Sequence, residues 1–190
     1  DPSRVRAIIK DELTEVRERF ADARRSRLVP DDGEMTHEDL IPVGEVVITL
    51  SRAGYVKRTP VDAFRTQRRG GRGVRGAEMK EDDLVSVLLT CSTHDTLLFF
   101  TNRGRAFRIK AYQVPEKQRS AKGVYVANVP GLALEADEQV ARVLPLSAFD
   151  PDRFLVFATA QGTVKRTSLD AFDSARSVLI ALKLNDGDEL

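Results

Sequence analysis

The chain has 190 residues, of which 42% are hydrophobic and 31% are charged, so it can form one good-sized domain or two small ones and is too apolar to be disordered or fibrous. Its 30 basic and 29 acidic residues give a net charge of +1, so overall charge does not indicate nucleic-acid binding. A single cysteine excludes a disulfide framework within the chain, and one cysteine with two histidines is too few for an ordinary zinc site. No apolar run is long enough to span a membrane. Together these features favour a soluble cytoplasmic protein.

Residues 1–28 have the pattern of an amphipathic helix. Asp1-Pro2-Ser3 supplies capping and first-turn residues. Apolar residues then recur at spacings of three and four, with charged residues between them: Val5, Ile8, Ile9, Leu13, Val16 and Phe20. This narrow stripe predicts either a coiled-coil-type helix lying against one partner or an ordinary amphipathic surface helix.

Residues 29–45 are acidic and contain helix breakers. Six acidic residues occur before the next basic one, Arg52, and Pro30, Gly33, Pro42 and Gly44 interrupt the segment. We expect a solvated linker between the helix and the rest of the chain.

From residue 46 onward the hydrophobic pattern predicts β-strands. Short runs rich in β-branched and aromatic residues are bounded by turn residues: Val46–Leu50, Val85–Leu89, Thr96–Phe100 and Arg153–Thr159.

One unit of this β region recurs three times. GYVKRT, which starts at Gly54, returns as GRAFRI from Gly104 and as GTVKRT from Gly162, at intervals of 50 and 58 residues. An apolar strand precedes each glycine, and an aromatic residue follows each unit: Phe64, Tyr112 and Phe172. A period of about 50 residues built from short strands is typical of propeller blades.

The predicted fold is therefore mostly β, a partial propeller-like array of about three four-stranded blades preceded by an α-helix. The expected blades span residues 46–93, 94–150 and 151–190. Because a closed ring usually needs four or more blades, we expect an open array that belongs to a longer protein or associates with itself.

Positive charge is concentrated at equivalent places in the repeats. Residues 57–80 and 103–122 each carry a local excess of six positive charges, and the third unit has a smaller cluster. This arrangement predicts a stripe that binds a phosphate backbone, which we call the basic edge. Its candidate residues are Lys57, Arg58, Arg65, Arg105, Arg108, Lys110, Arg119, Lys122, Lys165 and Arg166.

The most specific element is the basic glycine-rich segment QRRGGRG. Its glycines allow close approach to a phosphate backbone, and its arginines supply charge and forked donors. With no aromatic residue for base stacking, the segment favours sequence-independent contact with duplex phosphates over single-strand binding. Its members are Gln67, Arg68, Arg69, Gly70, Gly71, Arg72 and Gly73.

QRRGGRG following GYVKRTPVDAFRT resembles the gyrase A box of the DNA gyrase A-subunit family. The second and third repeats of that family are similar to CSTHDTLLFFTNRGRAFRIKAYQVP and FATAQGTVKRTSLDAFD. The sequences of these repeats are similar to those of actinobacterial gyrases. Residues 1–28 resemble the end of the long helix that leaves the breakage-reunion core, and residues 45–190 resemble the first half of the C-terminal domain.

The resemblance implies a β-pinwheel, a six-bladed disc with strands exchanged between neighbouring blades, whose basic rim bends duplex DNA and supports ATP-dependent negative supercoiling. It assigns the box to Gln67–Gly73 and rim contacts to the basic residues after each repeat glycine. It also implies as partners a B subunit of gyrase and a second A subunit, with ATP and Mg²⁺ used by other domains. About three of the six blades and no catalytic tyrosine domain match, and the third unit lacks the expected glycine pair after Arg176-Ser177.

The residues predict no catalysis, cofactor or metal site in this chain. No Gly-Lys-Ser/Thr sequence follows the box glycines, and the acidic turn Glu81-Asp82-Asp83 is more typical of a strand connection than of a metal site. Ser92, His94 and Asp95 lie too close together on one strand end for a triad. The alternatives to a DNA-wrapping module are a protein-interaction propeller and a gyrase-like fragment without wrapping activity.

Overall fold

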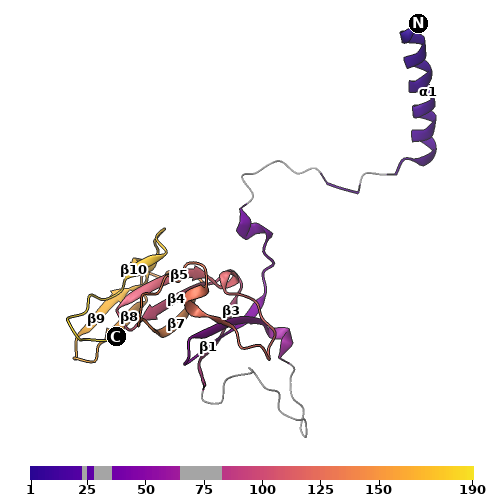
Figure 1. Ribbon diagram of the computed structural model, residues 1–190. Coiled ribbons are helices and arrows are strands. Elements are labelled where there is room, and N and C mark those ends of the chain that lie inside the picture. The colour runs from indigo at the N-terminus through magenta and orange to yellow at the C-terminus, as the bar shows by residue number, and fades with distance from the viewer. Residues whose placement is uncertain (23–24, 28–35, 65–82) are drawn as a thin grey trace. The chain divides into compact units, whose positions relative to one another are not determined.

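The computed structural model describes residues 1–22, 25–27, 36–64 and 83–190 (Figure 1). The chain divides into two compact units, Asp1–Met35 and Thr36–Leu190. Within the described part of the chain, no helix combines the length and the hydrophobicity needed to cross a bilayer.

The first unit contains α1 (Pro2–Phe20). The Asp1 carboxylate accepts a hydrogen bond from the Ser3 backbone N at 3.0 Å, which satisfies one of the free amides of the first turn. The helix ends where the apolar spacing ends, because Ala21 adopts an extended backbone. It is therefore shorter than the predicted range 1–28. The 19 residues of α1 are all described and none is buried, so its apolar stripe is exposed.

The second unit begins with a short 3-10 helix, η1 (His37–Leu40), in the acidic segment. The Asp39 carboxylate accepts hydrogen bonds from the backbone N and the hydroxyl of Thr36, at 2.8 and 2.7 Å. These bonds lower the pKa of Asp39. The acidic residues of η1 thus help to fix the backbone immediately before the first strand.

Ten strands follow within the residues that the structure describes, and they form three sheets of antiparallel neighbours. The first blade has the order β3-β1-β2-β6, with β1 (Glu45–Ser51), β2 (Tyr55–Pro60), β3 (Val85–Ser92) and β6 (Val124–Tyr125). The second has the order β7-β4-β5-β10, with β4 (Thr96–Thr101), β5 (Arg105–Lys110), β7 (Val140–Leu146) and β10 (Val178–Ile180). The third consists of β8 (Phe154–Ala158) and β9 (Val164–Ser168). The predicted fold class is confirmed, and each predicted run forms a strand.

The fourth strand of each complete blade is supplied by the following repeat. β6 comes from the second repeat and pairs with β2, and β10 comes from the third repeat and pairs with β5. This exchange of strands links the blades through backbone hydrogen bonds as well as through side-chain packing.

A hairpin with the same geometry starts every blade. Its turn glycine has a positive φ in each case, 82° at Gly54, 73° at Gly104 and 86° at Gly162. A 3-10 turn follows each second strand: η2 (Val61–Ala63), η3 (Ala111–Gln113) and η5 (Leu169–Phe172). A further 3-10 turn, η4 (Val126–Asn128), follows β6.

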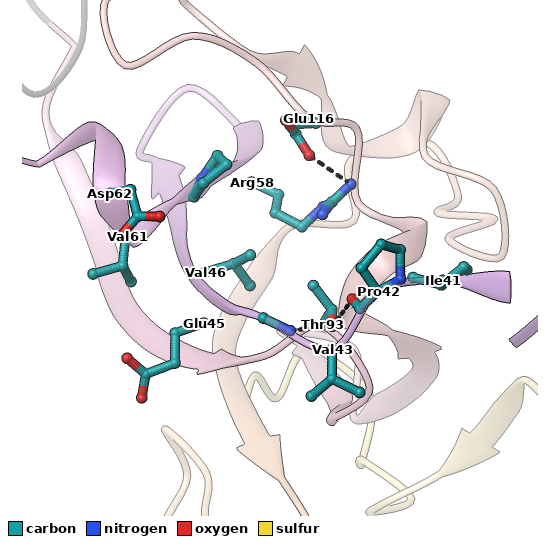
Figure 2. A pocket seen from close by; sticks show the side chains of 12 residues that line it. Ile41, Pro42, Val43, Glu45, Val46, Arg58, Val61, Asp62, Thr93 and Glu116 are labelled. Atoms are coloured by element: carbon teal, nitrogen blue, oxygen red, sulfur yellow. Dashed lines mark hydrogen bonds and ion pairs between the residues drawn. The ribbon is translucent and has the colours of Figure 1, made fainter. Parts of the chain in front are cut away.

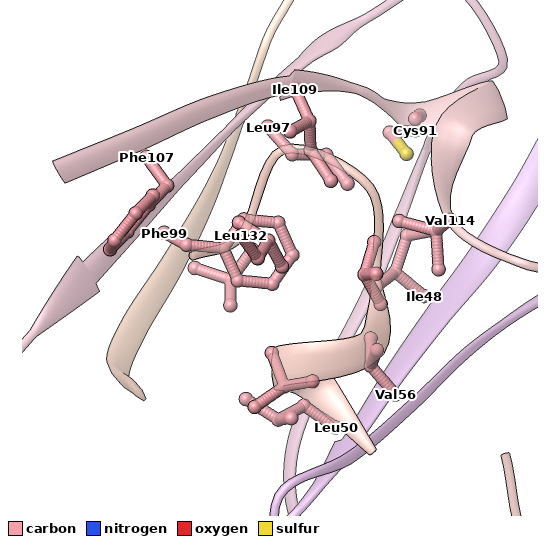
Figure 3. Packing of buried hydrophobic residues seen from close by; sticks show 14 of the residues in the cluster. Ile48, Leu50, Val56, Cys91, Leu97, Phe99, Phe107, Ile109, Val114 and Leu132 are labelled. Atoms are coloured by element: carbon pink, nitrogen blue, oxygen red, sulfur yellow. The ribbon is translucent and has the colours of Figure 1, made fainter. Parts of the chain in front are cut away.

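Two apolar clusters fill the interior between the sheets. Figure 3 shows side chains of the first blade, including Ile48 and Val56, beside Leu97, Phe99 and Phe107 of the second. All five are fully buried. The other cluster joins the second blade to the third hairpin through Phe100, Phe157 and Phe172, whose rings lie 5.3–6.1 Å apart. Each such side chain stabilises the fold by about 1.5–3 kcal/mol, so each blade depends on its neighbour.

Candidate nucleic-acid interface

The hairpins place one arginine at the same register in all three blades. Arg58 pairs with Ile48, Arg108 with Leu98 and Arg166 with Val156. In each hairpin, the partner of the arginine is the third residue of the first strand that takes part in the pairing. Residues directly opposite each other in an antiparallel pair project from the same face of the sheet. The three arginines therefore occupy one repeating position, as the sequence repeat suggests.

Arg58 and Arg108 both bind the repeat that follows their own. Arg58 Nε donates to the Val114 carbonyl at 3.1 Å, and its guanidinium pairs with Glu116 at 3.2 Å. Arg108 donates to the Ser174 carbonyl and pairs with Asp173 at 3.2 Å. Their side chains are only 15% and 24% exposed. Both guanidinium groups are therefore engaged within the protein.

The Arg58–Glu116 pair forms part of the wall of a pocket of about 500 Å³, shown in Figure 2. Thr93 lies in the same pocket, where its hydroxyl donates to the Pro42 carbonyl at 2.9 Å and accepts from Gly44 N at 3.1 Å. These bonds fasten the chain that enters β1 to the turn between β3 and β4.

Lys57 is buried, with an exposed fraction of 1%. Its ammonium donates to the Ala121 carbonyl at 2.8 Å and also to the Arg119 carbonyl. Burial lowers the pKa of Lys57, and the nearby Arg119 charge adds to this effect. The prediction of Lys57 as a residue of the basic edge does not agree with this burial, because a phosphate outside the fold does not reach its ammonium.

Arg105 is engaged with two carboxylates of the acidic turn before β7. It pairs with Glu135 at 3.1 Å and with Glu138, whose side chain is completely buried. Burial alone would raise the pKa of Glu138, but hydrogen bonds from Arg105 and Thr101 outweigh it and lower the pKa to about 2. The same contact raises the pKa of Arg105.

The remaining described members of the basic edge differ in exposure. Lys110 pairs with Glu38 of η1 at 2.7 Å and is partly exposed. Lys122 is partly exposed, with its ammonium 3.6 Å from the Tyr55 ring centroid, and Arg119 is partly exposed near the Ala63 carbonyl. Lys165 and Arg166 of β9 are exposed, and Arg166 stacks on Phe154 at 3.6 Å. Arg65 and the box residues 67–73 lie outside the described residues.

A family model for the DNA gyrase C-terminal domain, beta-propeller, matches residues 45–92, 95–147 and 153–190. The three matched segments correspond to the three repeats. The chain belongs to this gyrase C-terminal domain family.

Relatives and solved structures agree with this family. The chain is 48% identical to the DNA gyrase A subunit of Mycolicibacterium smegmatis over 190 residues and 45% identical to that of Streptomyces coelicolor over 186 residues. These alignments cover 100% and 97% of the chain but only 22% of each relative. The C-terminal domain of DNA topoisomerase IV superposes with a TM-score of 0.67 at 26% identity, covering 79% of this chain and 45% of that one. A DNA gyrase A C-terminal domain superposes with a TM-score of 0.58 at 24% identity, covering 76% and 45%.

The gyrase C-terminal fold of this chain contains a buried polar pair in each blade that the sequence interpretation missed. A hydroxyl three residues before the turn glycine bonds a buried carboxylate of the following acidic turn, in the pairs Ser51–Asp83, Thr101–Glu138 and Thr159–Asp188. The hydroxyl also accepts a hydrogen bond from the backbone N four residues later, at 3.1–3.3 Å. The recurring Ser/Thr-x-x-Gly pattern is the sequence signal that identifies these residues.

The structure also shows the surroundings of the side chains that could bind a metal or act in catalysis. The described residues contain no cluster of three metal-ligating side chains. Asp95 accepts a hydrogen bond from the Ser92 backbone N at 2.8 Å within the turn. His94 contacts the Thr93 hydroxyl beside it and the Glu38 carbonyl of η1, so these side chains hold the turn and η1 together. Cys91 is buried, and burial raises its pKa to about 11.

Proposed function

We propose that this chain binds and bends duplex DNA along the exposed part of its basic edge, and that it does so as part of a DNA gyrase. The observation that carries the proposal is the family match over all three repeats, joined to exposed cations at repeating positions of the fold. The chain spans 22% of the gyrase A subunits it matches, so supercoiling is proposed for the complex rather than for this chain.

The contacts and burial divide the basic edge into two groups. Arg58, Arg105, Arg108 and Lys110 form ion pairs with carboxylates, so each would have to exchange a carboxylate for a phosphate. We therefore assign the phosphate contacts to those cations of residues 117–122 and of β9 that form no ion pair with a carboxylate among the described residues. These are Lys117, Arg119, Lys122, Lys165 and Arg166, of which Lys117 was not among the candidates drawn from the sequence.

The gyrase A box, Gln67–Gly73, and Arg65 remain part of the proposal on the strength of the sequence. Glycine amides and forked guanidinium donors suit phosphate oxygens without reading bases. Replacing the box arginines with glutamine would then weaken DNA bending and leave the blades folded.

Binding by such a surface depends on the release of counterions. Each phosphate contact contributes about −0.9 to the slope of log affinity against log salt concentration. Bending a duplex of about 30 bp by 90° costs several kcal/mol, which the contacts along the edge must exceed. A duplex long enough to follow the edge should therefore bind more tightly than a short one.

In the complex, we propose two protein partners, the B subunit of gyrase and a second A subunit. Catalysis, ATP and Mg²⁺ would belong to other domains of gyrase, and we assign no catalytic residue in this chain.

The test compares duplexes of about 20 and 150 bp in a titration from about 50 to 300 mM salt. We expect tighter binding to the long duplex and a steep salt slope, on the order of −5 or steeper for six or more contacts. Weak binding that is indifferent to both length and salt would overturn the proposal and would favour a protein-interaction propeller.

A further inference from the structure

The loop of residues 114–123, which joins η3 to β6, lies against β2 of the preceding blade. Arg58 N donates to the Pro115 carbonyl at 3.1 Å, and Lys117 N donates to the Arg58 carbonyl at 2.9 Å. These two bonds form a parallel bridge between Arg58 and Glu116. The loop is therefore attached at its start to a strand from the previous repeat.

Three consecutive side chains of β2 hold the same loop. Lys57 and Thr59 lie on one face of the strand, and each is 1% exposed. Lys57 donates to the carbonyls of residues 119 and 121, and the Thr59 hydroxyl donates to the Lys117 carbonyl at 3.1 Å. From the other face, Arg58 contacts Val114 and Glu116.

Of the three β2 side chains, Lys57 depends most on its hydrogen bonds to the loop, because its charged ammonium is buried. A buried charge is costly unless hydrogen bonds replace its hydration. The carbonyls of residues 119 and 121 supply such bonds, and a lysine side chain without its ammonium would leave both of them without this donor. The loop and the buried lysine thus stabilise each other.

The loop also carries three of the cations assigned to DNA. Lys117 is exposed, Lys122 lies over the Tyr55 ring, and Arg119 is partly exposed with its Nε lacking a hydrogen-bond partner within the described residues. At the end of the loop, Gly123 has a φ of 99°, and a Cβ there would lie 2.7 Å from the Val56 carbonyl oxygen. The loop therefore approaches β2 closely along its length.

We propose that Lys57 is a positioning residue, which fixes the loop of residues 114–123 to the preceding blade and so holds its cations in place for the DNA backbone. The assignment of DNA as the ligand rests on the proposed function. The fixing of the loop rests on the contacts between β2 and the loop, and it does not depend on which ligand the cations bind. In this role the lysine acts on DNA binding without touching a phosphate.

The equivalent lysine of the third blade provides a contrast. Lys165 is exposed and donates to the Ala181 carbonyl at 2.7 Å, whereas Lys57 is buried beneath a loop from the next repeat. The same residue type at the same register is therefore a surface cation in one blade and an internal donor in another.

The test uses five variants of the full chain: Lys57→Met, Lys57→Arg, the triple variant Lys117→Gln/Arg119→Gln/Lys122→Gln, the triple variant combined with Lys57→Met, and Lys183→Met as the matched loss of an exposed lysine. Limited trypsin cleavage after Lys117, Arg119 and Lys122, mapped by mass spectrometry, reports release of the loop. Affinity for a 150 bp duplex across a salt series reports the DNA contacts.

We expect Lys57→Met to raise cleavage in the loop on the order of tenfold, with Lys57→Arg close to the original chain because it keeps the donors. Lys183→Met should not change loop cleavage. The affinity lost in Lys57→Met should approach that lost in the triple variant. Adding Lys57→Met to the triple variant should lower affinity no further, because the two changes remove the same contacts.

Unchanged loop cleavage in Lys57→Met would overturn the positioning role, and a salt slope shallower by about 0.9 in that variant would make Lys57 a phosphate contact instead. If cleavage rises equally after Arg142, the Lys57→Met variant has unfolded, and Lys57→Arg then decides: loop cleavage equal to that of the original chain supports the role, and raised loop cleavage contradicts it. A triple variant that binds DNA like the original chain would overturn the proposed DNA contacts of the loop while leaving its fixing by Lys57 intact.

Discussion

The second and third blades contain the same hairpin, and among the described residues a following repeat packs over the second. β5 pairs with β10, and Arg108 reaches Asp173 and Ser174 of the next repeat. Among the described residues, β9 pairs only with β8, and Arg166 is exposed. The comparison shows that the role of an arginine in this repeat depends on whether a later segment of the chain packs over it.

The largest expected difference between these blades concerns their turn glycines. Gly104 and Gly162 both have a positive φ, but a Cβ at Gly104 would clash with the Leu182 carbonyl oxygen, whereas a Cβ at Gly162 would meet no atom of the described part of the chain within 4 Å. Gly104→Ala should lower the free energy of unfolding by about 3 kcal/mol or more, and Gly162→Ala by about 1 kcal/mol, which is the cost of backbone strain alone. Urea unfolding of both variants measures this difference, and equal losses would contradict it.

The buried carboxylates should produce a smaller difference that depends on pH. The folded pKa of Glu138 is about 2, below its ordinary value of 4.5. Its contribution of roughly 3 kcal/mol is therefore present above pH 4.5 and is lost as the pH falls toward 2. Glu138→Gln should remove this part of the acid-induced loss of stability, as followed by thermal unfolding between pH 2 and 7.

The matched control for Glu138→Gln is Asp188→Asn in the third blade. Hydrogen bonds also lower the pKa of Asp188 against the opposing effect of burial, but its Oδ2 has no hydrogen-bond partner within the described residues. Asp188→Asn should therefore change the acid profile less than Glu138→Gln does. The reverse order would show that the Arg105 contact does not set the strength of these pairs.

The smallest expected difference concerns the arginines themselves. Arg108→Met removes a partly buried ion pair and a hydrogen bond to a carbonyl, and should cost about 1 kcal/mol of stability. Arg166→Met, at the exposed equivalent position, should change stability by less than about 0.5 kcal/mol. Equal losses in chemical denaturation would mean that contacts with the next repeat do not stabilise the second blade.

The hairpins could be predicted from sequence because each signal for them is local. Val46–Leu50 and Thr96–Phe100 are short apolar runs that end before a glycine turn, and each repeat shows the same order. The exchange of β6 and β10 was predicted only through the resemblance to the gyrase family. Strands of two and three residues carry too little pattern of their own to be identified from the residues.

Whether a charged side chain is exposed, ion-paired or buried was harder to predict, because its partner is distant in sequence. Lys57 was assigned to the basic edge because positive charge recurs after each repeat glycine, yet carbonyls more than 60 residues later accept hydrogen bonds from its ammonium. The acidic turn of residues 135–138 precedes β7, as the sequence predicts, but a count of charges does not reveal that Glu138 is buried under Arg105. A cluster of basic residues in such a repeat therefore predicts a DNA-binding surface only when the residues that are buried or ion-paired within the fold are left out of the cluster.

Strand exchange also determines the order in which the sheets are completed while the ribosome synthesises the chain. The first blade has three of its strands once Ser92 has emerged, but its fourth strand does not exist until Val124 and Tyr125 have been synthesised. The second blade waits in the same way for Val178–Ile180. Each blade therefore reaches its final stability one repeat behind the point of synthesis, and a nascent chain always carries one unfinished sheet at its growing end.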